Sequence, residues 1–288
     1  MNRWILGARP RTLPAAVVPV ALGAAAAVGE TGAVWWRAVL ALVVSLALQV
    51  GVNYANDYSD GGRGTDEGRV GPARLVASGL ASARSVKYAA FAAFGAAAVC
   101  GLVLALSTTL WLVLVGALSI LAGWFYTGGP RPYGYLGLGE IFVFVFFGLV
   151  ATAGTTFVVL EEITATAWWA GGAAGALACA LLVVNNLRDI PTDTVVGKRT
   201  LAVRLGDART RTFYVALLGL AWVVLIVIAV SDRPAAALGL VGVVAAAPAV
   251  RAVRSGAVGR DLIAVLGATG RVQLVTGLLA ALGIALGG

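Results

Sequence analysis

Two clusters of aspartate and asparagine side chains contain the residues best suited to chemistry. In the first cluster, Asn53, Asn56, Asp57 and Asp60 are spaced i, i+3, i+4 and i+7. On a helix this spacing places all four side chains on one face. Glycines follow, where we expect the helix to end, and Asp66 lies in the loop beyond them.

The second cluster has the same layout. Two amides, Asn185 and Asn186, are followed by Asp189 and Asp193 and then by glycine and basic residues. The steps from Asn185 to Asp189 and from Asp189 to Asp193 are both i, i+4, so these side chains also share a helical face. Pro191 leaves two possibilities: the helix continues through the proline with a kink, or it ends near Asp189 and Asp193 lies on a loop.

Paired acidic clusters of this kind are suited to binding a divalent metal together with a diphosphate. Mg²⁺ prefers oxygen ligands and usually binds through one or two carboxylates plus substrate phosphates. One ion on each cluster would clamp a diphosphate and neutralise the charge that develops as its carbon–oxygen bond breaks. Arg63, Lys198 and Arg199 are placed to bind the remaining phosphate oxygens. The alternative is that the acids only cap helices and pair with Arg63 or Arg188.

A third segment, residues 124–140, is rich in aromatic residues, glycine and proline. Its aromatic side chains either belong to the interfacial belt of a membrane protein or line a pocket for an aromatic substrate and shield a cation. In the second interpretation Tyr126 and Tyr133 contact the substrate and Arg131 holds its carboxylate. Glu140 opens a helix, where the helix dipole favours an acid, so capping explains it at least as well as catalysis.

The elements that must position these residues are membrane-spanning helices. The chain has 288 residues, 60% of them hydrophobic and only 12% charged, and its mean hydropathy is +0.93. Soluble domains carry about 25% charged residues, so lipid must be the main solvent. We expect one domain over residues 1–288, an all-α membrane protein built as a bundle of about nine transmembrane helices. The apolar windows lie near 12–29, 36–57, 86–106, 109–126, 139–160, 166–188, 211–231, 234–250 and 269–287.

The basic residues indicate the orientation of the bundle. With the N-terminus in the cytoplasm, every lysine and arginine except Arg37 and Arg233 falls on the cytoplasmic side, as the positive-inside rule requires. Both acidic clusters lie on that side too. We therefore expect a multi-pass protein of the inner (plasma) membrane whose active site faces the cytoplasm. The first segment also has features of a signal peptide, but we favour a first span.

The remaining composition narrows the chemistry and the partners. The positive charge is placed to meet anionic lipid heads, so the expected partner is the lipid bilayer and no nucleic acid. The chain has no histidine, and its two cysteines, Cys100 and Cys179, lie in apolar runs. These features argue against a zinc site or a disulfide framework.

At these residues the chain resembles the UbiA superfamily of intramembrane prenyltransferases. The family's two motifs are similar to Asn56-Asp57-x-x-Asp60 and to Asp189-x-x-x-Asp193 followed by Gly197-Lys198-x-Thr200. The resemblance covers nearly the whole chain. Many members have a further aspartate four residues after the second one. Here that position is Gly64, and the acid comes two residues later, at Asp66. This spacing resembles the subgroup that acts on dihydroxynaphthoate. It also weakens the inference, taken from the family, that Asp66 is a metal ligand.

The resemblance implies a reaction and a set of site residues. A polyprenyl group would pass from polyprenyl diphosphate to 1,4-dihydroxy-2-naphthoate, with loss of the acceptor's carboxylate, giving demethylmenaquinone in menaquinone biosynthesis. The implied catalytic residues are Asp57, Asp60, Asp189 and Asp193, which with Asp66 bind Mg²⁺. Diphosphate would be bound by Asn53, Asn56, Arg63, Asn185, Asn186, Lys198 and Arg199, and the acceptor by Tyr126, Arg131 and Tyr133. Without histidine, any proton acceptor would be a carboxylate, a tyrosine such as Tyr126, or released diphosphate.

Two alternatives remain open. One is a related prenyltransferase with another aromatic acceptor, such as 4-hydroxybenzoate, homogentisate or a haem; the loop around Arg131 would determine that choice. The other is a transporter, in which intramembrane acids mark the pathway. Transporters place such groups near the midplane, whereas here they lie at helix ends.

Overall fold

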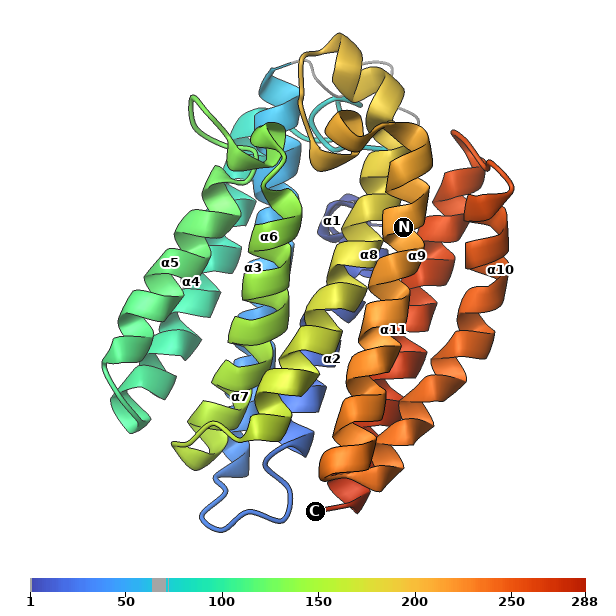
Figure 1. The fold of residues 1–288 in the computed structure, drawn as a ribbon. Coiled ribbons are helices and arrows are strands. Elements are labelled where there is room, and N and C mark those ends of the chain that lie inside the picture. The colour runs from blue at the N-terminus through green and yellow to red at the C-terminus, as the bar shows by residue number, and fades with distance from the viewer. Residues whose placement is uncertain (1, 64–70, 72) are drawn as a thin grey trace.

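The chain folds as a bundle of long helices that run up and down (Figure 1), and the computed structural model describes residues 2–63, 71 and 73–288. Within these residues every regular element is helical. The first part comprises α1 (Arg3–Ala8), the 3-10 helix η1 (Pro10–Thr12), α2 (Pro14–Ala25), α3 (Trp35–Gly62), α4 (Ala83–Ser107), α5 (Trp111–Phe125) and the 3-10 helix η2 (Tyr133–Leu136).

The second part begins with a composite helix made of α6 (Gly139–Val143), the π-helix η3 (Phe144–Val150) and α7 (Ala151–Leu160). It continues with α8 (Ala165–Val195), α9 (Leu201–Ser231), the 3-10 helix η4 (Pro234–Val241), α10 (Gly242–Arg254) and α11 (Asp261–Leu286). The expected all-α membrane bundle is confirmed.

Seven helices among the described residues are long and apolar enough to cross a membrane. They coincide with seven of the expected spans. The other two expected spans, near 12–29 and 109–126, correspond to the shorter apolar helices α2 and α5. A 12-residue helix such as α2 rises only about 18 Å. The total of nine crossings therefore stays a prediction.

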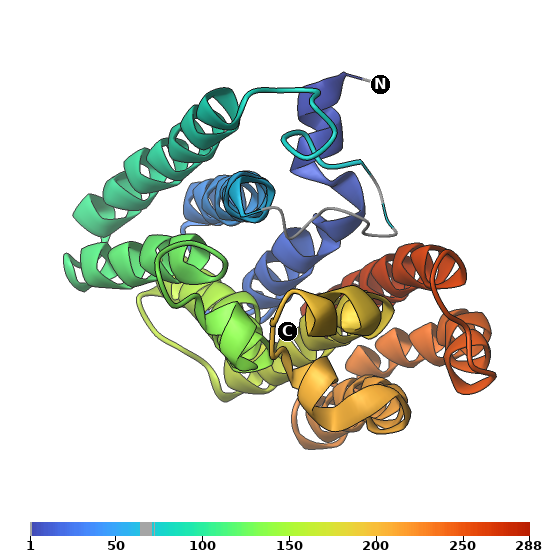
Figure 2. The ribbon, with the colours of Figure 1, turned by 90° about the horizontal axis from the view of Figure 1, so that it is seen from above.

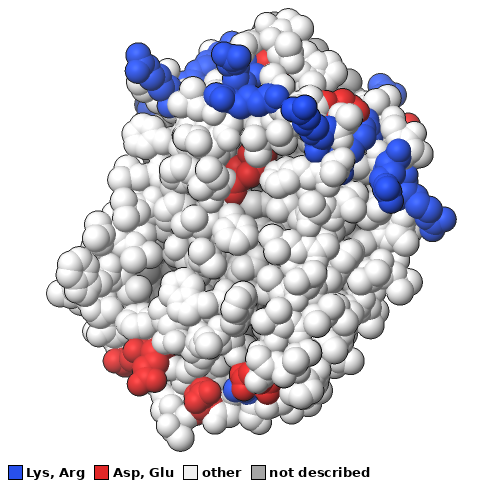
Figure 3. All heavy atoms as spheres, viewed as in Figure 1, with Lys and Arg blue, Asp and Glu red and all other residues white. Residues whose placement is uncertain are grey.

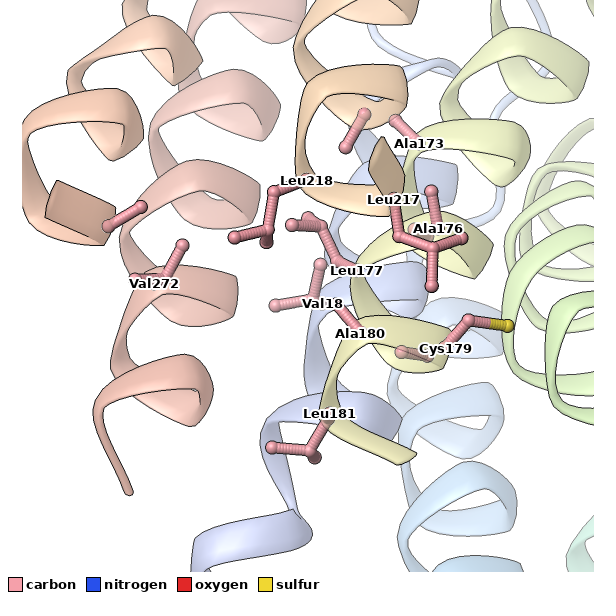
Figure 4. Close-up of a cluster of buried hydrophobic side chains, with 14 of the residues drawn as sticks. Val18, Ala173, Ala176, Leu177, Cys179, Ala180, Leu181, Leu217, Leu218 and Val272 are labelled. Carbon is pink, nitrogen blue, oxygen red and sulfur yellow. The ribbon is translucent and has the colours of Figure 1, made fainter. Parts of the chain in front are cut away.

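The apolar core lies around α8, which packs against α2, α9 and α11. Figure 4 shows side chains from all four helices meeting there, namely Val18, Leu177, Leu181, Leu218 and Val272. Seen from above, α8 lies inside the bundle (Figure 2). Many of its residues are alanine or glycine, which let membrane helices approach closely. This packing fixes where the end of α8, with its acidic cluster, lies.

The contact between α8 and η3 is especially close. A β-carbon built on Gly148 of η3 would lie 2.5 Å from the Cα atom of Gly175 and 2.7 Å from the carbonyl oxygen of Gly171. Both neighbouring atoms are backbone, so neither can turn aside. Glycine at position 148 thus sets the separation between the aromatic side chains of η3 and the helix that carries the second acidic cluster.

Both helices that carry the acidic clusters extend past the apolar spans predicted from the sequence. α3 runs to Gly62 and α8 to Val195. Pro191 lies inside α8, so the helix continues through the proline and Asp193 lies on the same helix as Asp189. Hydropathy detects only the apolar part of such a helix, whereas the amides and carboxylates that follow remain helical. α9 likewise begins earlier than expected, with a kink at Gly206 (φ 75°).

The two ends of the bundle differ in charge (Figure 3). Lysine and arginine gather at the end where α3 and α8 finish, called here the basic end, which also holds the acidic clusters. At the opposite end, called here the acidic end, acidic residues outnumber basic ones: Glu30, Glu161, Glu162 and Asp232 against Arg37 and Arg233. The two arginines at the acidic end are buried and paired. Arg37 lies 2.9 Å from Glu161 and donates to backbone carbonyls of α4 and α7. Arg233 pairs with Asp232 at 3.3 Å and with Glu30 at 3.6 Å. The orientation of the bundle in the membrane stays a prediction.

The close packing at Gly148 leads to a stability prediction. Gly148→Ala should destabilise the protein by about 1–3 kcal/mol, the usual cost of overpacking, because the added methyl group meets backbone atoms of α8. Gly172→Ala is the matched control on α8, where a β-carbon meets nothing within 4 Å. Thermal unfolding in detergent measures both variants. Equal melting temperatures for the two would contradict the packing argument.

Candidate active site

Both acidic clusters face one cavity of about 690 Å³. It begins at the basic end, between the ends of α3 and α8, and extends between α3, α4, α5 and α7 towards the acidic end. Its lining is polar and charged near the acidic clusters and mainly apolar further in. Figure 3 shows acidic atoms recessed below the band of lysine and arginine. The site therefore combines a charged mouth with an apolar interior.

The first cluster contributes three side chains to the cavity lining: Asn53, Asn56 and Asp60. Asp57 does not line the cavity. Its carboxylate oxygens accept hydrogen bonds from the backbone N–H groups of Leu75 (2.8 Å) and Val76 (3.0 Å). Asp57 thus holds the chain segment that leads from α3 to α4. Asp66 lies outside the described residues.

The amides of the first cluster connect α3 to its neighbours. The side-chain nitrogen of Asn53 donates to the carbonyl oxygen of Ala8 (2.9 Å) and to the Thr12 hydroxyl (3.0 Å). The Thr127 hydroxyl donates to the Asn56 side-chain oxygen (2.8 Å). These contacts bring the N-terminal segment and the loop after α5 to the edge of the cavity.

All four predicted residues of the second cluster line the cavity, namely Asn185, Asn186, Asp189 and Asp193. Arg188 lies among them. Its Nε and Nη2 atoms bind the two carboxylate oxygens of Asp189 at 2.7 and 2.8 Å, and Nη2 also donates to Asn185 (2.9 Å). Asn186 donates to the buried Glu140 (3.1 Å). Arg188 and Asp189 are both buried, and an isolated charge would be costly there.

Lys198 joins the two clusters. This buried side chain follows α8, and its Nζ atom lies 3.2 Å from Asp60 Oδ1, which also accepts a hydrogen bond from the Tyr135 hydroxyl (2.5 Å). Nζ also lies 4.6 Å from the centre of the Tyr135 ring. Burial lowers the pKa of Lys198, but Asp60, Tyr135 and Asp193 together outweigh it and raise the pKa above its ordinary value. Lys198 is therefore positively charged at neutral pH.

A row of aromatic rings leads from the acidic clusters into the cavity: Tyr126, Tyr133, Phe142 and Phe146. Tyr126 meets Tyr133 edge to face at 5.5 Å between ring centres, and Tyr133 stacks on Phe142 at 4.0 Å. Such rings can sandwich a flat substrate and shield a cation.

Three arginines predicted from the sequence do not line the cavity. Arg63 donates to two backbone carbonyl groups of the loop after α5, including that of Thr127 at 2.5 Å. It therefore holds this loop against the end of α3. Arg131 and Arg199 are exposed.

Four other arginines do line the cavity: Arg9, Arg11, Arg74 and Arg188. From the sequence we expect Arg188 only as a possible ion-pair partner of the acids. Its position between Asn185 and Asp189, at the same end of the helix, could have predicted that it lines the site. The other three lie in segments where the positive-inside rule already accounts for a basic residue. The stretch from Ala8 to Pro14, which contains Arg9 and Arg11, also resembles the family, and that resemblance was the available signal for these two arginines.

The donor set of the cavity fits a hard divalent cation such as Mg²⁺. Asp60, Asp189 and Asp193 supply carboxylate oxygens. The described part of the chain contains no group of three acidic, histidine or cysteine side chains placed to hold an ion by themselves. A cation here would take one or two carboxylates and complete its coordination with phosphate oxygens and water, which is how Mg²⁺ usually binds.

The buried pair of Lys198 and Asp60 leads to a second prediction. Lys198→Met leaves the Asp60 carboxylate without its ammonium partner, and we expect a loss of about 3–5 kcal/mol in the free energy of unfolding, the usual cost of breaking a buried ion pair. Adding Asp60→Asn removes the charge, so the double variant should regain most of this loss. Chemical or thermal unfolding in detergent measures the cycle. Losses that simply add would show that the two side chains do not interact.

Comparison with known proteins gives relatives over most of the chain. The sequence profile of the UbiA prenyltransferase family matches residues 16–262. A Mycobacterium tuberculosis protein named 1,4-dihydroxy-2-naphthoate octaprenyltransferase is 53% identical over 285 residues, which cover 99% of this chain and 97% of that protein. An Escherichia coli protein of the same name is 37% identical over 229 residues, which cover 75% of this chain and 72% of that protein.

Solved structures have the same fold. A UbiA homolog from Archaeoglobus fulgidus, solved bound to GPP and Mg²⁺, matches with a TM-score of 0.66 at 14% identity. The match covers 99% of this chain and 100% of that one. At 14% identity this similarity shows only that the folds are alike. The family relationship rests on the sequence matches. The chain belongs to the UbiA prenyltransferase family.

Proposed function

We propose that this protein transfers a polyprenyl group from polyprenyl diphosphate to 1,4-dihydroxy-2-naphthoate in menaquinone biosynthesis. The observation that carries the proposal is that the acidic clusters of α3 and α8 face one cavity with an apolar interior. A diphosphate suits its charged mouth and a prenyl chain suits its interior. The names of the two bacterial relatives support this choice of acceptor.

The proposed reaction balances without an added oxidant or a strong base. The bond between C1 of the prenyl group and the diphosphate oxygen breaks, and both electrons leave on the oxygen. A carbon of the electron-rich naphthoate ring forms a bond to C1. The acceptor's carboxylate leaves as CO₂, and the electrons of that bond restore the aromatic ring. The product is a prenylated naphthoquinol, the reduced form of demethylmenaquinone.

The buried cations bind the diphosphate. Lys198 and Arg188 are both charged side chains fixed at the cavity by their carboxylate partners. Negative charge grows on the leaving oxygen as the bond breaks, and fixed cations in a site that excludes water stabilise it more than water does. Arg9, Arg11 and Arg74 add positive charge along the same lining.

The carboxylates that we propose for Mg²⁺ are Asp60, Asp189 and Asp193, with Asp57 and Asp66 as further ligands suggested by the sequence. When bound, Mg²⁺ would neutralise part of the charge on the leaving diphosphate. The protein's own contribution is to hold the carboxylates in place, through Arg188 for Asp189 and through Lys198 and Tyr135 for Asp60.

The acceptor lies against the aromatic row. Tyr126 and Tyr133 line the cavity beside the acidic clusters, and Phe142 continues the row inwards. Stacked rings hold the flat naphthoate and shield positive charge that develops on the prenyl group. They also exclude water, which would otherwise react with that carbon.

We further propose that the chain is a single domain in the plasma membrane and that its basic end faces the cytoplasm. The charge asymmetry supports this orientation, because basic residues are retained on the cytoplasmic side during insertion. The water-soluble substrate, the naphthoate, and the Mg²⁺ ion would then both reach the charged mouth from the cytoplasm.

A product assay tests the function. Purified protein in detergent receives dihydroxynaphthoate and radiolabelled octaprenyl diphosphate, with Mg²⁺ or with EDTA. We expect a lipid-soluble labelled product that requires metal. Asp60→Asn and Asp189→Asn should each lower the rate by about 10²–10³, the typical loss when a charge-stabilising group is removed. Asp207→Asn is the matched control, since Asp207 is an exposed aspartate paired with Arg211 outside the cavity.

The outcomes separate the possibilities. Transfer to 4-hydroxybenzoate but not to dihydroxynaphthoate would keep the mechanism and change the acceptor. Full activity in EDTA would exclude the metal proposal. No transfer to any aromatic acid, from folded protein, would overturn the proposed function and favour transport.

Substitutions at two arginines test which of them contacts the substrates: Arg188, which lines the cavity, or Arg131, which lies in the loop after α5. Arg188→Met should lower kcat/KM by about 10–100-fold, because charge-assisted hydrogen bonds contribute about 1.5–3 kcal/mol each. Arg131→Ala should change the KM for the acceptor by less than about twofold, as an exposed side chain usually does. Steady-state kinetics with each substrate varied measures both. A large rise in acceptor KM for Arg131→Ala would instead support the carboxylate-binding role predicted from the sequence.

A further inference from the structure

Three glycines line the deeper, apolar part of the cavity: Gly101 of α4, Gly116 of α5 and Gly154 of α7. A β-carbon built on any of them meets nothing within 4 Å. The neighbouring protein atoms therefore do not require glycine at these positions. A larger side chain at any of the three would extend from the cavity lining into space that no neighbouring protein atom fills.

The three glycines lie at a similar depth. Each is five or six residues from the end of its helix at the acidic end, Ser107, Trp111 or Leu160. At 1.5 Å per residue this is about 8–9 Å. Ala41, a cavity-lining residue of α3, is likewise six residues from Trp35. We call this depth, defined by the three glycines, the glycine level. Past it, the lining includes Leu104, Leu112 and Val158.

The glycine level is far from the charged mouth. Along α3 the cavity lining runs from Asp60 to Ala41, a rise of about 28 Å. A geranyl chain spans only about 10 Å, given carbon–carbon bonds near 1.5 Å. A chain whose diphosphate is held at the acidic clusters reaches the glycine level only if it is several times longer.

Some glycines of this protein serve helix packing, whereas Gly95 and Gly172 have open space like the glycine level but do not line the cavity. A β-carbon on Gly148 or Gly277 would come within 2.5 Å of atoms of a neighbouring helix. Close approach of helices explains those positions. Close approach of helices does not explain Gly101, Gly116 and Gly154, because no neighbouring atom lies within 4 Å of their β-carbon positions. Glycine destabilises a helix interior relative to alanine, and here it leaves open space in the cavity.

We propose that Gly101, Gly116 and Gly154 determine the length of the prenyl chain that the protein accepts. This inference rests on the proposed function, because it takes the occupant of the cavity to be the donor's prenyl chain. Long chains pass between the three glycines into the space lined by Leu104, Leu112 and Val158. Short chains end before the glycine level and do not contact it.

The test compares a short and a long donor on the same variants. Gly116→Leu and Gly154→Leu fill the glycine level. Gly95→Leu is the matched control, because Gly95 lies on α4, is exposed, does not line the cavity and has nothing within 4 Å of its β-carbon position. Binding of geranyl diphosphate and of octaprenyl diphosphate is measured directly by ligand-induced thermal stabilisation in detergent, without acceptor. Transfer rates with dihydroxynaphthoate follow.

We expect the affinity for octaprenyl diphosphate to fall at least about tenfold in the two cavity variants, since a misfit of one methylene in an apolar pocket already costs 10–200-fold. Affinity for geranyl diphosphate should stay within about twofold of wild type, which also shows that the variants are folded. Gly95→Leu should match wild type with both donors. A leucine variant that binds neither donor is not shown to be folded, so Gly116→Ala and Gly154→Ala are then measured instead. For these alanine variants we expect a smaller loss of affinity, and only for octaprenyl diphosphate.

The chain-length inference is wrong if wild type binds both donors and the cavity variants keep the same ratio of affinities for octaprenyl and geranyl diphosphate. That result would leave the proposed function intact. An equal effect of Gly95→Leu would overturn the chain-length inference as well. Wild-type protein that binds neither donor would overturn both proposals. Binding of both donors without transfer to the naphthoate would count against the proposed acceptor only.

Discussion

The site depends on one constraint: carboxylates placed at the edge of a membrane must have partners. Removing a carboxylate from water costs several kcal/mol, and a nearby cation or several hydrogen-bond donors must offset that cost. Asp60 meets this need through Lys198 and Tyr135, which lie on segments far apart in the sequence. Because one oxygen of Asp60 contacts both, the end of α3 is tied to the segment after α8 and to the loop after α5. The shape of the charged mouth follows from these ties.

The same pairs prepare the site for its proposed substrate. Asp189 is already bound on both oxygens by Arg188, so its position is set before any ligand arrives. An incoming diphosphate would bring negative charge, and a divalent cation bound with it would bring positive charge. The acids and bases of the protein could then exchange partners without leaving a bare charge in a region of low dielectric. Such exchange limits the cost of moving a highly charged group to the membrane edge.

Much of this arrangement was predictable from the sequence, and the misses have physical causes. Helix periodicity predicts that Asp60 shares a face with Asn53 and Asn56, and all three line the cavity. Periodicity does not say which partner each side chain finds, so Asp57 looks equivalent to Asp60 although it binds backbone groups instead. The sequence does not decide whether α8 continues through Pro191. Proline disfavours a helix interior locally, whereas packing against neighbouring helices can keep the segment helical. Arg131 is exposed and does not line the cavity, so its predicted role in binding the acceptor's carboxylate stays a prediction.

The contact made by Asp57 has a consequence for how the following segment tolerates change. Its carboxylate binds main-chain N–H groups at positions 75 and 76, not side chains. Every residue except proline offers that donor. This contact therefore does not depend on the side chains at positions 75 and 76, and the Leu75 side chain is held separately by burial. The contact does depend on register, because an insertion or deletion between Gly62 and Leu75 would change which amides reach the carboxylate. Asp57 thus fixes the path of the main chain here and excludes proline at two positions.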